Sequence, residues 1–155
     1  MQLKSSVFEH QGSIPEQYTC EGNDMNPPLE LIDIPSKAVS LVLIMDDPDV
    51  PASVRADRMW DHWVLYNIPP NTRHIQENGL SPPGVPGKNT QGTLSYIGPC
   101  PPDKEHRYFF KLYALDTLLS LEAGATKKEV LSAIEGHVIA YAELIGLYCK
   151  KHLRK

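Results

Sequence analysis

Residues 38–51 read AVSLVLIMDDPDVP, and this stretch decides the fold class. Residues 38–45 are apolar almost throughout, and their length and composition are typical of a strand. Because polar residues do not alternate along it, we predict a central strand that is covered on both faces. An acidic turn follows, in which Pro48 and Pro51 restrict the backbone on either side of Asp49.

The rest of the chain predicts a mostly β domain with one short, late helix. All 14 prolines precede residue 103, so long helices are confined to the last third. A helix is predicted over 127–134, because Thr126 and Glu129 form a capping box before it. The segment 137–148 fits either a second helix or a buried strand. Segments of strand composition lie at 60–68 and 108–115, with weaker candidates at 3–8, 29–32 and 93–97. The proline-rich stretch 80–86 is predicted to be a long loop.

Composition and charge exclude several classes of protein. The chain has 155 residues, 41% hydrophobic and 22% charged, which fits one globular domain. Four of the 15 basic residues lie in the last six, so the rest carries 11 basic against 19 acidic residues and would repel a nucleic-acid backbone. No apolar run reaches the roughly 18 residues that a membrane span needs. We therefore expect a domain over 1–150, a solvated basic tail over 151–155, no nucleic-acid partner and no stable membrane insertion.

The cysteines and the first residues indicate a compartment. Cys20, Cys100 and Cys149 form no CxxC pair and cannot all pair with one another, which suits free thiols in a reducing environment. The first 16 residues lack the apolar core of a secretory signal. The sequence therefore predicts a cytoplasmic protein and favours free thiols, and it leaves the redox state of the three cysteines open.

Polar residues stand where predicted strands end or begin. Asp47 and Asp49 follow the strand over 38–45, and Trp60 and His62 open the strand over 60–68. If these strands are antiparallel neighbours, both groups lie at the same edge of the sheet. Strict alternation along 60–68 then places four residues on one face: Trp60, His62, Val64 and Tyr66.

A third polar group lies further along the chain. The run Gly98-Pro99-Cys100-Pro101-Pro102 precedes a strand in which alternation puts His106, Tyr108 and Phe110 on one face. An aspartate and two histidines are thus predicted to converge at one edge of the sheet. Taken one at a time, an Asp-Pro-Asp turn, a strand histidine and a proline-rich connector are ordinary structural features.

Together and in this order, these motifs resemble the phosphatidylethanolamine-binding protein family, in particular its bacterial and archaeal branch, called Raf kinase inhibitor-like. The matches are spread over nearly the whole chain. They comprise Ile14-Pro15 to Tyr18, Gly22-Asn23, Asn26-Pro27-Pro28-Leu29, Asp47-Pro48-Asp49-Val50-Pro51, His62-Trp63-Val64-Leu65-Tyr66-Asn67-Ile68-Pro69, Gly87-Lys88-Asn89, Gly98 to Pro102, His106-Arg107-Tyr108, Tyr113-Ala114-Leu115-Asp116 and Gly136-His137-Val138.

The resemblance implies a central antiparallel Greek-key sheet, a smaller sheet packed on it and a short late helix, and it favours a strand over 142–148. It also implies a pocket for phosphate-like anions and phospholipid head groups at one end of the central sheet. Val50 stands where the family usually has alanine, which would narrow the rim of that pocket. By position, the lining residues are Asp47, Asp49, Trp60, His62, Gly98, Pro99, Cys100, His106 and Tyr108.

We therefore expect a non-catalytic protein that binds a small anionic or phosphorylated ligand. Histidine N–H groups, the Tyr108 hydroxyl and an amide near Gly98 are the predicted donors, and Asp47 is predicted to accept from His62 or His106 or to receive an ammonium group. The alternative is a metal-dependent or cysteine-based enzyme that uses the same histidines, aspartate and Cys100. No cofactor or metal is expected, because paired-histidine spacing is absent.

The resemblance also implies a regulatory partner such as a kinase, which would share this site with the ligand. Nothing in the sequence identifies that partner. Both a monomer and a homodimer remain open.

Overall fold

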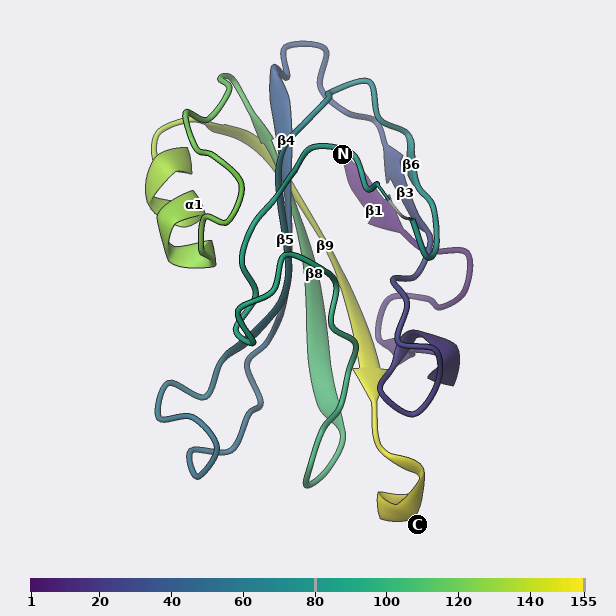
Figure 1. Cartoon of the computed structure of the whole chain (residues 1–155). Coiled ribbons are helices and arrows are strands. Elements are labelled where there is room, and N and C mark those ends of the chain that lie inside the picture. The colour runs from purple at the N-terminus through teal and green to yellow at the C-terminus, as the bar shows by residue number, and fades with distance from the viewer. Residues whose placement is uncertain (80, 155) are drawn as a thin grey trace.

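The computed structural model describes residues 1–79 and 81–154, and two β-sheets form its frame (Figure 1). The larger sheet has the strand order β2-β9-β8-β4-β5-β7, and the smaller has the order β1-β3-β6. Helix α1 covers one face of the larger sheet, and the smaller sheet lies on the other side. The larger-sheet strands are β2 (Gly12–Ser13), β4 (Ser40–Asp47), β5 (Trp60–Ile68), β7 (Val85–Pro86), β8 (His106–Leu115) and β9 (Val138–Tyr148). The other elements are β1 (Gln2–Lys4), β3 (Leu29–Ile32), β6 (His74–Ile75), α1 (Lys127–Ile134) and the 3-10 turns η1 (Glu16–Tyr18) and η2 (Lys151–Leu153).

Strand β4 is the central strand that the sequence predicts. All eight of its residues are buried, and it pairs antiparallel with β5 on one side and β8 on the other. Leu41, Leu43 and Met45 belong to the core between the two sheets, whereas Val42 and Ile44 pack in a second cluster with Val130 and Ile134 of α1. Because both faces are covered by apolar side chains, the strand needs no polar alternation.

Most of the predicted strands are confirmed, with shifted ends. The prediction for 60–68 matches β5, and that for 108–115 begins two residues late. Of the segment 3–8, only the start belongs to a strand. The strand prediction for 93–97 is wrong, because these residues form a loop. Thr93 bonds to Asn89, and the single bond from the Ile97 amide to the His62 carbonyl of β5 does not continue into a ladder.

The ambiguous segment after the helix is a single strand, β9. It pairs with β8 along its whole length, from Val138 opposite Leu115 to Tyr148 opposite His106. The strand expected over 142–148 is therefore present and begins four residues earlier. The backbone N–H and C=O groups of β9 form hydrogen bonds with β8. This pairing with a distant strand cannot be read from the local sequence pattern.

Helix α1 begins at the predicted capping box. The Thr126 hydroxyl accepts from the Glu129 amide at 3.2 Å, and the Glu129 carboxylate accepts from the Thr126 amide at 3.1 Å. We expect Thr126→Ala to lower the free energy of unfolding by about 1 kcal/mol, because an amide of the first turn loses its acceptor. Urea denaturation measures the change. Ser132→Ala, at an exposed position of the same helix, is the control and should leave stability unchanged within about 0.5 kcal/mol. Equal losses in the two variants would contradict the role of the cap.

The preference for free thiols is wrong for two of the three cysteines, because Cys20 and Cys100 form a disulfide across 80 residues of sequence. The fold brings the turn after η1 beside the proline-rich run, with the two Cα atoms 5.4 Å apart. Among the described residues, Cys149 is the free cysteine. Free thiols therefore no longer support a cytoplasmic location, which stays a prediction.

Two further predictions touch positions outside the described residues. In the predicted loop 80–86, Leu80 lies outside them, and Val85–Pro86 pairs with β5 as strand β7. In the predicted basic tail, Lys155 lies outside them, while Lys151 forms an ion pair with Glu16 and its amide donates to Glu21 at 3.0 Å. Among the described residues, no helix is long and apolar enough to span a bilayer.

Candidate functional site

Three strand ends meet at one edge of the larger sheet and carry the predicted polar groups. Asp47, the last residue of β4, lies opposite Trp60, the first residue of β5. His106 is the first residue of β8, which pairs with β4 on its other side. The prediction that the strands over 38–45 and 60–68 are antiparallel neighbours is confirmed. The side chains converge although Asp47 and His106 are 59 residues apart.

A β-bulge at His62 directs its ring into the site. Met45 lies opposite Trp63 and Asp46 lies opposite Asp61, so His62 is an extra residue in β5. Predicted strict alternation along β5 is therefore wrong. Val64 and Tyr66 pack beneath α1, whereas the His62 ring meets Tyr108 edge-on at 5.3 Å on the opposite face.

Asp47 and His106 form a buried ion pair at the site. His106 Nδ1 lies 2.6 Å from Asp47 Oδ2, and the two side chains are 1% and 4% exposed. His106 Nε2 lies 2.7 Å from Asp103 Oδ1. Burial opposes a charge on the ring, but the hydrogen bonds to Asp47 and Asp103 outweigh it and raise the pKa of His106. Since carboxylates accept, both ring nitrogens donate, and His106 is an imidazolium.

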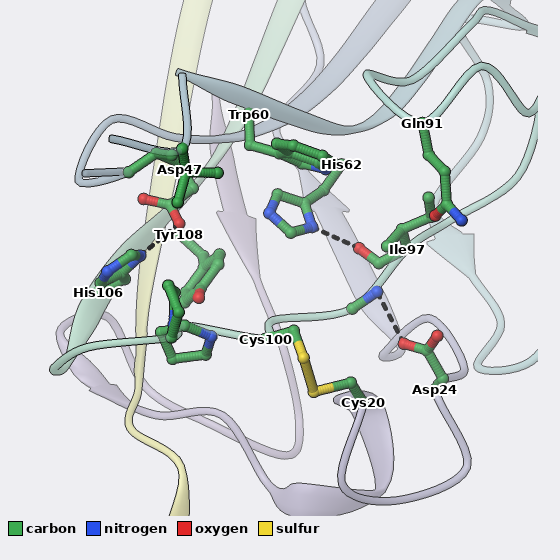
Figure 2. A pocket seen from close by; sticks show the side chains of 15 residues that line it. Cys20, Asp24, Asp47, Trp60, His62, Gln91, Ile97, Cys100, His106 and Tyr108 are labelled. Atoms are coloured by element: carbon green, nitrogen blue, oxygen red, sulfur yellow. Dashed lines mark hydrogen bonds and ion pairs between the residues drawn. A yellow bond between two sulfur atoms is a disulfide. The ribbon is translucent and has the colours of Figure 1, made fainter. Parts of the chain in front are cut away.

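His62 has the opposite character. Its Nδ1 lies 2.6 Å from the carbonyl oxygen of Ile97, which can only accept, so this nitrogen carries a proton. Burial lowers the pKa of His62 and favours the neutral ring, despite the backbone hydrogen bond to Ile97 and the nearby Asp47, which act the other way. Figure 2 shows the second ring nitrogen, Nε2, turned away from Ile97. Among the described residues no group is bonded to Nε2, which is therefore a free acceptor.

Tyr108 contributes an unpartnered hydroxyl. The side chain is fully buried, and its Oη has no hydrogen-bond partner among the described residues. Burial raises the pKa of Tyr108, followed by the charge of Asp47, so the phenol stays protonated and its hydrogen is free to donate. A buried hydroxyl without a partner costs free energy, which a ligand acceptor would recover.

These groups line a cavity of about 440 Å³. In Figure 2, Trp60 lies on one side of His62 and the Cys20–Cys100 disulfide on the other. The apolar part of the lining consists of Val50, Val54, Trp60, Ile97, Pro101 and Pro102, and the polar part includes Asp24, Asp47, His62, Gln91, His106 and Tyr108. A concave, mostly apolar cavity with a few converging polar groups is the usual form of a small-ligand site.

Seven of the nine predicted site residues line the cavity: Asp47, Trp60, His62, Gly98, Cys100, His106 and Tyr108. Asp49 instead binds the guanidinium of Arg107 at 2.8 and 2.9 Å, and these hydrogen bonds lower the pKa of Asp49. Pro99 is buried, and its carbonyl accepts from the Cys20 amide at 3.1 Å. Asp49 and Pro99 therefore support the wall from outside the lining.

Asp24 is a lining residue that sequence reasoning missed. Its carboxylate accepts from the Gly98 amide at 2.8 Å, across 74 residues of sequence. It has φ +57°, a conformation that Asp adopts more readily than most residues. The only signal was its place beside the Gly22-Asn23 motif. Val50 lies in the lining, as its predicted place at the rim requires, whereas six further lining residues were missing from the predicted site: Cys20, Val54, Gln91, Ile97, Pro101 and Pro102.

Two predicted donors are already occupied. The Gly98 amide is bound to Asp24, so it is not free to complete an anion nest. Both ring nitrogens of His106 are bound to carboxylates, so His106 offers the cavity no free N–H group. The predicted role of Asp47 as a hydrogen-bond acceptor is confirmed, with His106 as its donor.

Because Gly98 has no side chain, the part of the cavity wall around it can lie directly against the segment 18–24. A Cβ at this position would overlap the Tyr18 carbonyl oxygen and an Asp24 carboxylate oxygen. We expect Gly98→Ala to lower the free energy of unfolding by about 2 kcal/mol, because backbone must move to accept the methyl group. Thermal and urea unfolding measure the loss. Gly79→Ala is the control, since its Cβ would make an ordinary contact with the Gln76 carbonyl. A fully stable Gly98→Ala protein would contradict the close approach.

No group of three or more histidine, cysteine, aspartate or glutamate side chains that could hold a metal ion occurs in the described part of the chain. The cysteine of the enzyme alternative, Cys100, is in a disulfide and offers no thiolate. The absence of metal from the purified protein stays a prediction, which elemental analysis would check.

Comparison with known proteins assigns the family. The phosphatidylethanolamine-binding protein family profile matches residues 4–149. The chain belongs to the phosphatidylethanolamine-binding protein family. A "UPF0098 protein" of the archaeon Methanothermobacter thermautotrophicus is 53% identical, over 96% of this chain and 98% of its own length. A second, from the bacterium Chlamydia trachomatis, is 50% identical, over 97% of this chain and 99% of its own length.

Solved structures of the family have the same fold. CT736 of Chlamydia trachomatis, described as a homologue of phosphatidylethanolamine-binding protein, has a TM-score of 0.94 at 49% identity, and the match covers 97% of both chains. YbcL of Escherichia coli, described as a new member of the mammalian family, has a TM-score of 0.86 at 27% identity, with 97% of this chain and 98% of YbcL covered. The predicted family and its bacterial and archaeal branch are confirmed, as is the fold class.

Proposed function

We propose that this protein is a non-catalytic binding protein for a small phosphate-bearing ligand, such as a phospholipid head group or a free phosphate. The observation that carries the proposal is the pair of unpartnered polar groups in the cavity, His62 Nε2 and the Tyr108 hydroxyl. One is an acceptor and the other a donor, on rings 5.3 Å apart.

A monoprotonated phosphate matches this pair. Its P–OH group can donate to His62 Nε2 while another phosphate oxygen accepts from the Tyr108 hydroxyl. A fully deprotonated anion instead requires His62 to take up a proton, because neutral Nε2 cannot donate. The negative charges of Asp24 and Asp47 favour proton uptake by His62 in the complex. They also disfavour a dianionic ligand beside a neutral His62 ring.

Two features support binding rather than catalysis. Cys100 is oxidised, and both His106 nitrogens are bound to carboxylates, so the nucleophile and one base of the enzyme alternative are engaged. The partners stay predictions of the family resemblance: a kinase or another regulatory protein could share this edge of the sheet. Neither a monomer nor a homodimer is favoured by the site.

The proposal is tested by an NMR titration with inorganic phosphate and with phosphoethanolamine. We expect the largest shifts at the His62 ring and the Tyr108 ring and smaller ones at His106, whose donors are already used. His152, in the basic segment, is the internal control. Shifts confined to His152 and its neighbours would overturn the proposal. Shifts with phosphoethanolamine but none with phosphate would show that the ammonium end dominates and would overturn the assignment to phosphate.

A further inference from the structure

The Cys20–Cys100 disulfide is part of the cavity surface. Both cysteines line the cavity and both are exposed to solvent. Figure 2 shows the sulfur–sulfur bond on the side of the cavity opposite Trp60. A disulfide that only stabilises a fold is usually shielded from thiols, whereas an exposed one is open to exchange with them.

The disulfide joins two segments whose hydrogen bonds to each other end before Cys100. The Gly98 amide donates to the Asp24 carboxylate at 2.8 Å. The Cys20 amide donates to the Pro99 carbonyl at 3.1 Å. The Tyr96 hydroxyl donates to the Tyr18 carbonyl at 2.7 Å. These bonds fix the wall through Pro99.

Over residues 100–105, the disulfide is the covalent cross-link of the wall in the described part of the chain. In the described part of the chain, no backbone hydrogen bond joins residues 100–105 to another segment. The hydrogen bond that His106 Nε2 donates to the Asp103 carboxylate lies at the far end of the segment. Pro101 and Pro102, which line the cavity, therefore lie between one covalent link and one ion pair.

We propose that Cys20–Cys100 is a site of thiol–disulfide exchange with small thiols, and that its redox state controls the order of the cavity wall over residues 100–105. The second part, an effect on phosphate affinity, rests on the proposed function. The exchange itself does not.

In this exchange the small thiol is the reductant of the Cys20–Cys100 disulfide. A thiolate attacks one sulfur, a mixed disulfide forms, and the other cysteine leaves as a thiolate. A second thiol resolves the mixed disulfide, so two small thiols become one small disulfide. Their two protons end on the Cys20 and Cys100 thiols.

By linkage, order in the wall and binding in the cavity affect one another. A ligand that contacts the wall binds more weakly when that wall must first be ordered. The same ligand should make the disulfide harder to reduce, by the same factor.

The exchange is tested with Cys149→Ser, which keeps the disulfide and removes the other cysteine, in glutathione buffers without denaturant. Trapping free thiols by alkylation and mass measurement counts the reduced cysteines. We expect two alkylated cysteines in the native protein within an hour at millimolar glutathione and pH 8. Reduction only after denaturant is added would overturn the exchange site.

The wall is tested by NMR relaxation of the backbone amides in the oxidised and reduced protein. We expect the order parameters of Cys100, Asp103, Lys104 and Glu105 to fall from about 0.85 to below about 0.6 after reduction, while those of Gly98, β8 and β9 stay unchanged. The Cys20→Ser and Cys100→Ser double variant should reproduce the reduced pattern without any reductant. Unchanged order parameters over residues 100–105 would overturn the control of the wall, and an equal loss of order across β8 and β9 would overturn it too, because it would show a general structural link.

The last measurement is the affinity for inorganic phosphate in both redox forms. A fall of fivefold or more on reduction supports the coupling. Equal affinity in both forms would overturn the coupling and leave the proposed function intact. Binding to neither form would overturn the proposed function, while the exchange and wall measurements would still decide the rest.

Discussion

Replacing Asp47 with alanine is expected to lower the free energy of unfolding by about 3–5 kcal/mol, the largest stability loss of any single substitution at the site. The pair that it breaks is buried, with His106 Nδ1 and Asp47 Oδ2 2.6 Å apart. The variant leaves the buried imidazolium of His106 with only the Asp103 carboxylate as its partner. It also removes the acceptor of the Asp49 amide, bound to Asp47 Oδ1 at 2.7 Å. Urea denaturation near pH 6 measures the change.

Asp103→Ala is the matched control, because Asp103 binds the other nitrogen of the same ring. Its side chain is 41% exposed, so water screens the charge and replaces the lost acceptor. We expect a loss of about 1 kcal/mol or less. If both substitutions cost the same, burial of the Asp47 pair is not what stabilises this edge of the sheet.

The effect of Asp47→Ala should also depend on pH. The folded protein raises the pKa of His106 above its reference value of about 6.5. A group with a raised pKa stabilises the fold fully below the unfolded pKa, and this stabilisation is lost as the pH rises through the folded pKa. The stability difference between wild type and Asp47→Ala should therefore be larger at pH 6 than at pH 9. A constant difference would show that His106 is not charged in the fold.

Replacing His62 with glutamine is expected to weaken sulfate binding at least tenfold at pH 5.5. Sulfate stays a dianion across this range, so it is held by a protonated His62 and not by the neutral ring. Burial lowers the pKa of His62 in the free protein, and the anion must raise it in the complex. As the pH rises from the pKa of His62 in the free protein to its pKa in the sulfate complex, wild-type affinity should therefore fall about tenfold per pH unit. Because burial lowers the first of these values, the fall should start below about pH 6.5. The His62→Gln variant should lose this slope. Calorimetric titration measures both.

Two further variants separate the roles of charge and hydrogen bonding. Tyr108→Phe keeps the ring and removes the unpartnered hydroxyl, so we expect weaker sulfate binding with the wild-type pH slope. His137→Gln, at an exposed histidine that binds Asp116, should change neither affinity nor slope. Equal wild-type affinity at pH 5.5 and pH 8 would show that His62 does not supply the charge.

The polar residues at the ends of β4, β5 and β8 could be predicted as site residues, because their positions follow from where each strand begins or ends. The apolar run before Asp46 predicts a buried strand, and the turn after it must emerge at an edge of the sheet. The polar starts of β5 and β8 then lie at the same edge once the three strands are antiparallel neighbours. Residues that share a strand end are therefore accessible to sequence reasoning, and seven of the nine line the cavity.

The state of each group could not be predicted, because it depends on partners distant in the chain. His62 and His106 have the same reference pKa of about 6.5. Burial favours the neutral ring of His62, and the Ile97 carbonyl fixes which of its nitrogens carries the proton, whereas two carboxylates make His106 charged. The sequence alone treated both histidines as equivalent donors.

The amino-acid sequence by itself determined the central strand, the capped helix, the family and the edge of the sheet that carries the site. These depend on periodicity, proline positions and motifs that are local in the chain. Only the tertiary structure decided the bulge that turns His62, the carboxylate of Asp24 in the wall and the pairing of Cys20 with Cys100. Each of these depends on which backbone lies opposite or beside another, and contacts between segments 74 or 80 residues apart leave no periodic trace in one sequence.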